Sequence, residues 1–330
     1  MFSTKNINNT NRKSEIHRAK SIMEGFNKIG CDAINVGQYE MLNGLKFLKE
    51  IADNSSIPFI SANLRDSKTS ELIFRPYSVV EKNQLKFGII GVTNLLPDTC
   101  KTIISDSFID AGNNYAKELS KKTDFLIMLV NADRDSQNDL ASKFPEVDFI
   151  ITSGSTNMSR ANSPQKEHGP YFYSCGKQGK HLLFIEGSLT DSKHPLIDIS
   201  SHQKKINDIN KRFDRLQKKD PEKSLEKIYS DQQNILKLIK QYRSDLENSN
   251  NVISNAVNTL TYKTIALNSK IKDDPALLAF VDASVETCNS LDPTFSKVKN
   301  KTPKKKQNPK NPKLKKQSIK NKIGHPGHNH

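Results

Sequence analysis

The sequence predicts an α/β fold for residues 1–200, with sheets that are covered on both faces. Two observations predict it: short apolar runs rich in β-forming residues recur along this part of the chain, and helix-like stretches separate them. Continuous apolar strands separated by helices are typical of sheets buried between other layers. A third observation, a change of pattern near residue 200, marks the point where helices are expected to take over.

The strands and helices of this part are predicted to alternate along the chain. Helices are expected near residues 14–28, 43–53, 109–121 and 135–143. The apolar runs that predict strands lie at residues 33–36, 58–61, 86–92, 125–130, 149–152, 171–174 and 182–185.

Residues 201–295 are predicted to be a helical segment with a short stripe like that of a coiled coil. An early stripe runs from Ile206 to Leu216, and Asp220-Pro221 separates it from a second one, which indicates a helical hairpin or a short coiled coil. Residues spaced three and four apart share one helix face. The second stripe, within 225–246, consists of Ile228, Gln232, Ile235, Ile239, Tyr242 and Leu246.

The second stripe allows two packing arrangements. It extends for about two heptads, which is short for an independent zipper. We therefore expect it to pack on the α/β domain, while self-association through 225–246 stays open as the alternative. Residues 250–295 are expected to be further helical structure, with Asp273-Asp274-Pro275 as a helix start.

Residues 296–330 are predicted to be a disordered Lys-rich tail. Between Lys297 and Lys322 there are twelve lysines and no Asp or Glu, in a chain whose net charge is +15. So few apolar residues cannot offset the entropy lost on ordering. The segment is either a solvated tail or a non-specific contact for polyanions through 297–322. It lacks aromatic residues, which argues against base stacking.

The tail ends in a histidine cluster formed by His325, His328 and His330. Such tracts bind zinc or nickel weakly, so these three are the candidate metal ligands of the chain. The alternative is that they are simply the end of the tail. No cofactor is assigned from these residues.

Cysteine spacing and hydropathy limit the other classes of function. Cys31, Cys100, Cys175 and Cys288 form no Cys-x-x-Cys motif, which argues against zinc-ribbon, redox and haem-attachment sites. No run approaches the ~20 apolar residues of a membrane-spanning helix. The first ten residues lack the apolar segment of a secretory signal, so a cytoplasmic location is expected for the chain as written.

Seven segments between residues 31 and 187 resemble, in order, the catalytic domain of the 5′-nucleotidase branch of the calcineurin-like metallophosphoesterases. The first, residues 31–40, stands where the family has an apolar strand running into Gly-Asn-His-Glu. The others are 44–48, 58–64, 75–77 with 86–93, 124–129, 147–151 and 176–183. The resemblance implies the layered αββα sandwich of that family. It also implies a pair of divalent metal ions that activate water and clamp phosphoryl oxygens.

The positions that match the family's metal ligands hold other residues. Gln38 stands in place of the motif's Asn, and Tyr39 in place of its His. Glu40 is retained, although it is not a ligand in the family. Asn131 stands in place of the His after the fourth strand. In the Gly-His-x-His loop, Gly154 and Thr156 replace both histidines.

None of these replacements supplies an imidazole nitrogen, so the ligands of the metal pair are mostly absent and no catalytic residue is assigned. The family's first two motifs, Asp-x-His and Gly-Asp, have no match in residues 1–30. We therefore expect a degenerate domain that is incomplete at its N-terminus. A true start further upstream would restore the missing motifs. It would also place the protein in the periplasm or outside the cell if a signal peptide came with it.

Three functions remain open at this point. The first is a 5′-nucleotidase-like protein with a degraded dimetal site that serves as a non-catalytic binding or structural module. The second is an active metal-dependent phosphoesterase whose first motifs lie upstream. The third is an interaction protein that works through the helical segment and the basic tail.

Overall fold

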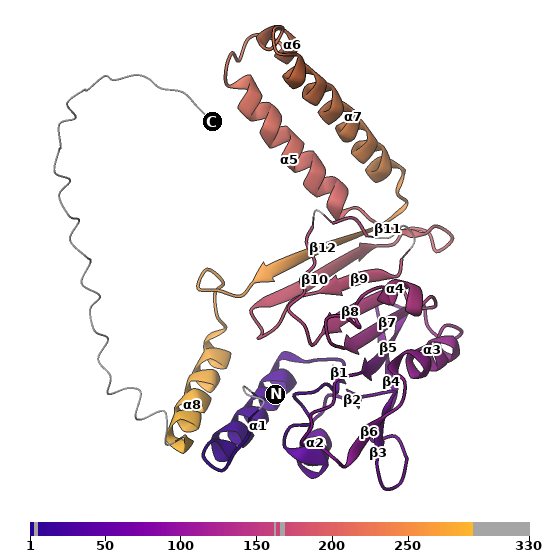
Figure 1. Cartoon of the computed structure of the whole chain (residues 1–330), viewed down its shortest axis with the longest axis vertical. Helices are drawn as coiled ribbons and strands as arrows, with labels where there is room; N and C mark the ends of the chain where they lie inside the picture. The colour runs from indigo at the N-terminus through magenta and orange to yellow at the C-terminus, as the bar shows by residue number, and fades with distance from the viewer. Residues whose placement is uncertain (3–5, 162, 166–168, 293–330) are drawn as a thin grey trace, which may run out of the picture.

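The structure is a computed structural model, which describes residues 1–2, 6–161, 163–165 and 169–292. Its core is a mixed α/β fold, as the sequence predicts, and a pair of long helices projects from one end (Figure 1). The predicted tail, 296–330, lies outside the described residues, and so does its histidine cluster.

A five-stranded sheet forms the centre of the fold. Its order is β4-β5-β7-β8-β9, with four parallel strands and β4 antiparallel at one edge. The predicted apolar runs account for β5, β7, β8 and β9, because a strand buried on both faces needs apolar side chains at successive positions. The strands are β4 (Tyr77–Lys82), β5 (Leu85–Thr93), β7 (Phe125–Asn131), β8 (Phe149–Ser153) and β9 (Tyr171–Ser174).

One face of this sheet packs on α3 (Phe108–Leu119) and on the short α4 (Leu140–Lys143). The hydroxyl of Ser107 accepts a hydrogen bond from the Asp110 backbone N–H and so caps α3. The helix expected at 135–143 is mostly turns, since only its last four residues are helical. Fully buried residues from both layers form the core of this face: Ile90, Ala116, Met128, Phe144 and Ile150.

A second sheet covers part of the other face. Its order is β10-β12-β11, built from β10 (His181–Ser188), β11 (Leu196–Asp198) and β12 (Asn258–Ala266). The two sheets share a cluster that contains Phe149, Tyr173 and Tyr262. The strand β12 corrects the expectation that 250–295 is helical throughout. Its buried residues alternate with more exposed ones at the start of the strand, which is the period of a strand and not of a helix.

The N-terminal part forms its own cluster beside the central sheet. Two small sheets lie here: β1 (Ile34–Asn35) pairs in parallel with β2 (Phe59–Ile60), and β3 (Leu64–Asp66) pairs with β6 (Ile103–Ser105). The helices α1 (Arg12–Ile29) and α2 (Gly44–Asp53) contribute the apolar residues that cover them.

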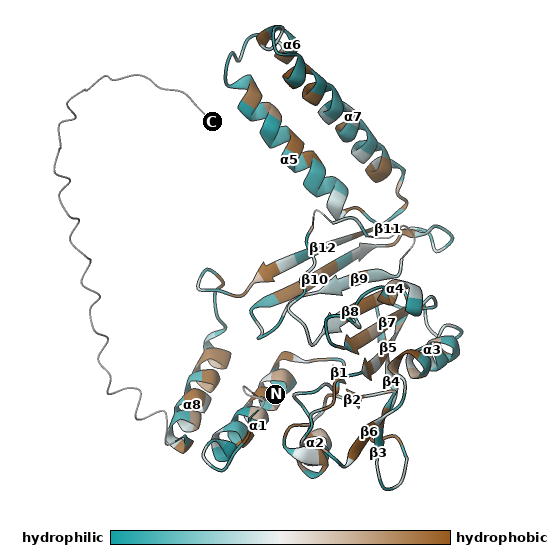
Figure 2. Cartoon of the chain, in the orientation of Figure 1, coloured by the Kyte–Doolittle hydropathy of each residue, from teal (hydrophilic) through white to brown (hydrophobic). Residues whose placement is uncertain are grey.

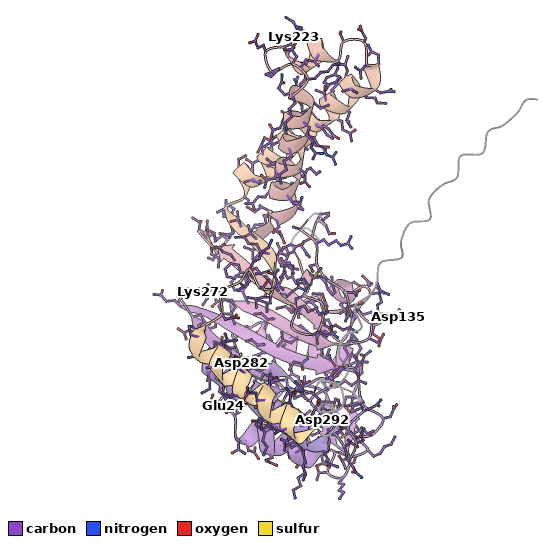
Figure 3. All side chains as sticks on the ribbon, turned by 90° about the vertical axis from the view of Figure 1, so that its left-hand side faces the viewer. Glu24, Asp135, Lys223, Lys272, Asp282 and Asp292 are labelled. Carbon is purple, nitrogen blue, oxygen red and sulfur yellow. The ribbon has the colours of Figure 1, made fainter. Side chains whose placement is uncertain are left out.

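The last helix of the described chain, α8 (Pro275–Leu291), returns to the N-terminal part and lies along α1 (Figures 1 and 3). Its start is the one predicted: the Asp274 carboxylate accepts hydrogen bonds from the backbone N–H groups of Ala276 and Leu277. Cys288 is buried against α1, with its thiol 3.7 Å from the Ser14 carbonyl oxygen. Among the described residues, no helix is long and apolar enough to cross a membrane.

The helical hairpin consists of α5 (Ser200–Gln217), α6 (Leu225–Ile228) and α7 (Gln233–Asn255). Figure 3 shows Lys223 at its far end, away from the sheets. Of the two predicted alternatives, the structure has the hairpin, and the break between α5 and α6 contains Asp220-Pro221 as predicted. Two expectations are wrong: the second stripe is interrupted between α6 and α7, and it packs on α5 instead of on the α/β domain. Apolar residues of all three helices form one cluster, and hydrophilic segments alternate with hydrophobic ones along both long helices (Figure 2).

Candidate functional site

The carboxyl ends of the parallel strands bring together side chains that are far apart in the sequence. Thr93 ends β5, Asn131 ends β7 and Ser153 ends β8. The strand register places Asn131 beside both of the others. In open α/β sheets, ligands bind outside this edge, so the side chains here form the candidate site.

Both polar atoms of the Asn131 side chain are engaged in hydrogen bonds. Its Oδ1 accepts from the Gln38 backbone N–H at 3.1 Å and from the Thr93 hydroxyl at 3.1 Å. Its Nδ2 donates to Ser153 Oγ at 3.0 Å. The residue is only 9% exposed. We call these four residues, Gln38, Thr93, Asn131 and Ser153, the amide–hydroxyl cluster.

The loop after β1 lies directly on this cluster. A Cβ atom on Gly37 would lie 2.8 Å from Asn131 Cγ, so only glycine fits here without a shift. The Glu40 carboxylate turns back into its own loop, where it accepts a hydrogen bond from the Gly37 backbone N–H at 3.0 Å and pairs with the Met1 amino group. Tyr39 lies at the surface, with 38% of its area exposed.

The loop after β8 has a backbone that excludes a side chain at its first position. Gly154 has a φ of +93°, and a Cβ atom there would lie 2.5 Å from the Ala132 carbonyl oxygen. In this conformation, a histidine at position 154 would be strained and would also clash with backbone. Thr156 is exposed two residues further on and does not join the amide–hydroxyl cluster.

A buried amide holds the loops after β7 and β8 together. Gln137 Nε2 donates to the carbonyl oxygens of Ala132 and Ser153, both at 2.9 Å. Its Oε1 accepts from Ser155 Oγ at 2.8 Å and from Asn157 Nδ2 at 3.0 Å. Hydrogen bonds between protein groups therefore hold the shape of the loop after β8.

The acidic residues after β7 do not form a cation site. Hydrogen bonds from the Ser136 backbone N–H, the Ser136 hydroxyl and the Asn94 amide lower the pKa of Asp133 to about 2. Asp135 is exposed, and Figure 3 shows it at the edge of the molecule. Asp139 precedes α4 in a left-handed conformation. Among the residues that the structure describes, no three His, Cys, Asp or Glu side chains could hold a metal ion together.

The residues present at this edge do not fit the metal pair that the resemblance implies. A divalent pair needs carboxylate or imidazole ligands, whereas the amide–hydroxyl cluster is neutral. Its Asn131 amide oxygen already accepts two hydrogen bonds. The nearby Asn35 Oδ1 is buried without a hydrogen-bond partner, but a single neutral oxygen does not make a metal site.

Of the predicted site positions, the structure brings Gln38 and Asn131 together, through the backbone of Gln38, and leaves the others apart. The sequence reasoning did not select Thr93, Ser153 or Gln137. A signal for the first two existed, since each is a hydroxyl residue that directly follows a predicted apolar run. The lysine segment 297–322 and the candidate ligands His325, His328 and His330 lie outside the described residues.

Comparisons with known proteins support the resemblance over part of the chain. No family model matches. The chain is 35% identical over 101 residues to a 5′-nucleotidase of Vibrio parahaemolyticus, covering 31% of this chain and 18% of that protein. It is 32% identical over 110 residues to protein UshA of Salmonella pullorum, covering 33% and 20%. The chain thus spans about a fifth of the length of these relatives.

Solved structures resemble the chain at lower identity. A 5′-nucleotidase precursor from Thermus thermophilus superposes with a TM-score of 0.44 at 17% identity, over 54% of this chain and 39% of that one. The calcineurin-like phosphoesterase YfkN from Bacillus subtilis gives 0.45 at 20% identity, over 55% and 66%.

The matched part of the chain, 101 to 110 residues, is similar in sequence to a 5′-nucleotidase and to UshA. This similarity supports the resemblance of the seven segments to the 5′-nucleotidase-like branch of the metallophosphoesterases.

Proposed function

We propose that this chain is a 5′-nucleotidase-like module that no longer hydrolyses phosphoesters and that serves in binding or in structure. The observation that carries the proposal is that both polar atoms of the Asn131 side chain already have hydrogen-bond partners within the protein. In a working dimetal site, ligand atoms keep lone pairs free for the cations. Here the amide oxygen is occupied by Gln38 and Thr93, and the amide nitrogen by Ser153.

The electrostatics of the edge support the same proposal. A divalent cation placed beside the amide–hydroxyl cluster would lose water ligands and would gain no negative charge from its four members. The acidic residue two positions after Asn131, Asp133, already accepts hydrogen bonds from Asn94, Asp135 and Ser136. Binding a metal there would require breaking those contacts.

The loop after β8 supplies a second, independent support. Its backbone at Gly154 has no room for a side chain, so the loop is adapted to a residue that cannot be a ligand. A single substitution back to histidine would therefore meet both strain and a clash, and we do not expect it to restore a ligand.

The test is an assay of the purified full chain with AMP and with bis(p-nitrophenyl) phosphate, in the presence of manganese, cobalt or zinc. We expect no turnover that a chelator abolishes. We also expect no heat of binding for manganese by calorimetry at a tenfold excess over protein.

The control that identifies contaminating phosphatase is the variant Asn131→Ala. Turnover that is equal in the wild type and in this variant comes from a contaminant and agrees with the proposal. Chelator-sensitive turnover that is lost in Asn131→Ala would overturn it, and the alternative of an active phosphoesterase would then hold.

A further inference from the structure

An apolar pocket lies between the two sheets, away from the amide–hydroxyl cluster. Its volume is about 320 Å³, and exposed residues at the turn that joins β4 to β5 are among those that line it. The three-stranded sheet covers only part of the central sheet, so side chains of β5, β7 and β8 remain half-exposed at this edge. The pocket is therefore a gap between two layers that both belong to this chain.

The floor of the pocket is a row of aromatic rings on neighbouring strands. The ring centroids of Phe87 and Phe125 lie 5.6 Å apart in a stacked arrangement, and those of Phe125 and Phe149 lie 6.0 Å apart. Aliphatic side chains of the second sheet, among them Ile185 and Leu260, form the opposite wall. Apolar cavities of this kind bind apolar groups in preference to water.

Gly187 on β10 is one reason for the free space. It lines the pocket, and a Cβ atom added to it would meet only Leu260 Cδ1, at 3.9 Å. Its φ lies outside the positive region in which side chains are strained. A Cβ atom is therefore tolerated at this position, and we expect a larger side chain to take up space in the pocket.

The polar residues that line the pocket, Lys82 and Asn83, are both exposed, so we place the mouth of the pocket beside them. They belong to the hairpin between β4 and β5, whose two turn residues, Asn83 and Gln84, both have positive φ. The Lys82 ammonium pairs with Asp32 at 3.3 Å, and both side chains are more than half exposed. Such a pair contributes about 0–1 kcal/mol, so the ammonium is readily available to another anion.

We propose that this pocket binds a small amphipathic acid, with its apolar body between the sheets and its anionic head at Lys82. The size is at the lower end of the range for small-molecule sites, about 300–1,000 Å³. The walls supply affinity through burial of apolar surface, and the lysine at the mouth selects for a negative head group. The inference does not depend on metal binding or on phosphoester chemistry.

The first test is calorimetric titration of the full chain with octanoate, 1-octanol and acetate. We expect octanoate to bind with a negative heat-capacity change, 1-octanol to bind at least threefold more weakly, and acetate not to bind. Added chelator should change none of these results. If octanoate does not bind at millimolar concentration, the pocket is not a ligand site and the inference fails.

Two substitutions on β10 test whether octanoate binds in this pocket. Gly187→Leu should weaken octanoate binding at least tenfold, because its side chain occupies the space of the apolar body. Ser188→Leu is the matched control, since alternate residues of a strand point to opposite faces. We expect less than a twofold change for it. Equal effects of the two substitutions, or none from Gly187→Leu, would overturn the assignment to this pocket.

Variants at the mouth test the head group. Lys82→Gln should weaken octanoate binding at least threefold and leave 1-octanol unchanged. Asp32→Asn should strengthen octanoate binding, because it removes the anion that competes for Lys82. If both variants bind octanoate as the wild type does, the pocket takes neutral apolar ligands and the proposed acid is wrong.

Discussion

The carboxyl edge of the central sheet and the helical hairpin differ in how far apart in the sequence their contacting residues lie. At the edge, polar groups from distant parts of the chain hydrogen-bond to one another: the Gln38 backbone N–H donates to the side chain of Asn131, 93 positions further along the chain. In the hairpin, the buried contacts come from a single stretch of sequence, with Leu225, Tyr229 and Ile239 between two adjacent helices. The edge depends on the whole fold, whereas the hairpin depends mainly on itself.

This contrast indicates where the molecule tolerates change. The edge combines buried polar groups with backbone that passes very close to side chains, so few substitutions fit there. The hairpin buries a small cluster and exposes most of its surface, so its loss should leave the sheets intact. Four substitutions test this contrast, in order of decreasing expected effect.

The greatest loss of stability is expected from Gly154→Ala at the edge. The new methyl group would lie 2.5 Å from the Ala132 carbonyl oxygen, at a φ of +93°. We expect a loss of about 3 kcal/mol in the free energy of unfolding, measured in urea. Gly179→Ala is the control, because Gly179 also has positive φ but has nothing within 4 Å of its Cβ position. It should cost about 1 kcal/mol, and equal losses would contradict tight packing at the edge.

A smaller loss is expected from Asn131→Leu. The substitution leaves the Gln38 backbone N–H without its acceptor, and it removes a side-chain partner from each of the hydroxyls of Thr93 and Ser153. We expect a loss of about 2 kcal/mol by urea unfolding, since buried polar groups are left unpaired. Asn138→Leu, in an exposed turn of the next loop, should change stability by at most about 0.5 kcal/mol. If Asn131→Leu leaves the free energy of unfolding unchanged, the amide–hydroxyl cluster contributes little to stability.

In the hairpin, Ile239→Ala should act locally. Ile239 is 2% exposed within the helical cluster, so its truncation leaves a cavity between α5 and α7. Amide hydrogen exchange should become faster in both helices and stay unchanged in the five-stranded sheet. Leu238→Ala is the neighbouring control, at a residue that is 39% exposed. Faster exchange throughout the sheet would mean that hairpin and sheets unfold as one unit.

The weakest effect is expected from Asp133→Asn, and it depends on pH. The folded-state pKa of about 2 lies below the ordinary value of 3.8, so the carboxylate stabilises the fold at neutral pH. That contribution is fully present above about pH 4 and is lost as the pH falls toward 2. Urea unfolding at pH 7 and at pH 3 should therefore show a flatter pH dependence for the variant. Asp135→Asn is the control. If the stability of Asp133→Asn depends on pH as that of the wild type and of the control does, the hydrogen bonds to Asp133 are not formed in solution.

The local features of this protein could be predicted from its residues alone. The apolar runs predicted β5, β7 and β8, Asp274-Pro275 predicted the start of α8, and the two apolar stripes predicted a helical hairpin. The residues at positions 38, 131, 154 and 156 are also known from the sequence alone, and their replacement of metal ligands stays a prediction. Each of these depends on residue type, or on contacts within a few turns of the same element, and such information lies in a short window of sequence.

Which distant residues meet could be learned only from the folded chain. There, β12 pairs with β10 and β11 in a region that helices flank on both sides, because burial against the central sheet favours a strand. The helix α7 packs on α5 and away from the sheets. Asn131 joins Gln38 and Thr93, and room for a pocket remains beside Gly187. These outcomes depend on long-range packing, for which a residue's own neighbours in sequence carry no signal.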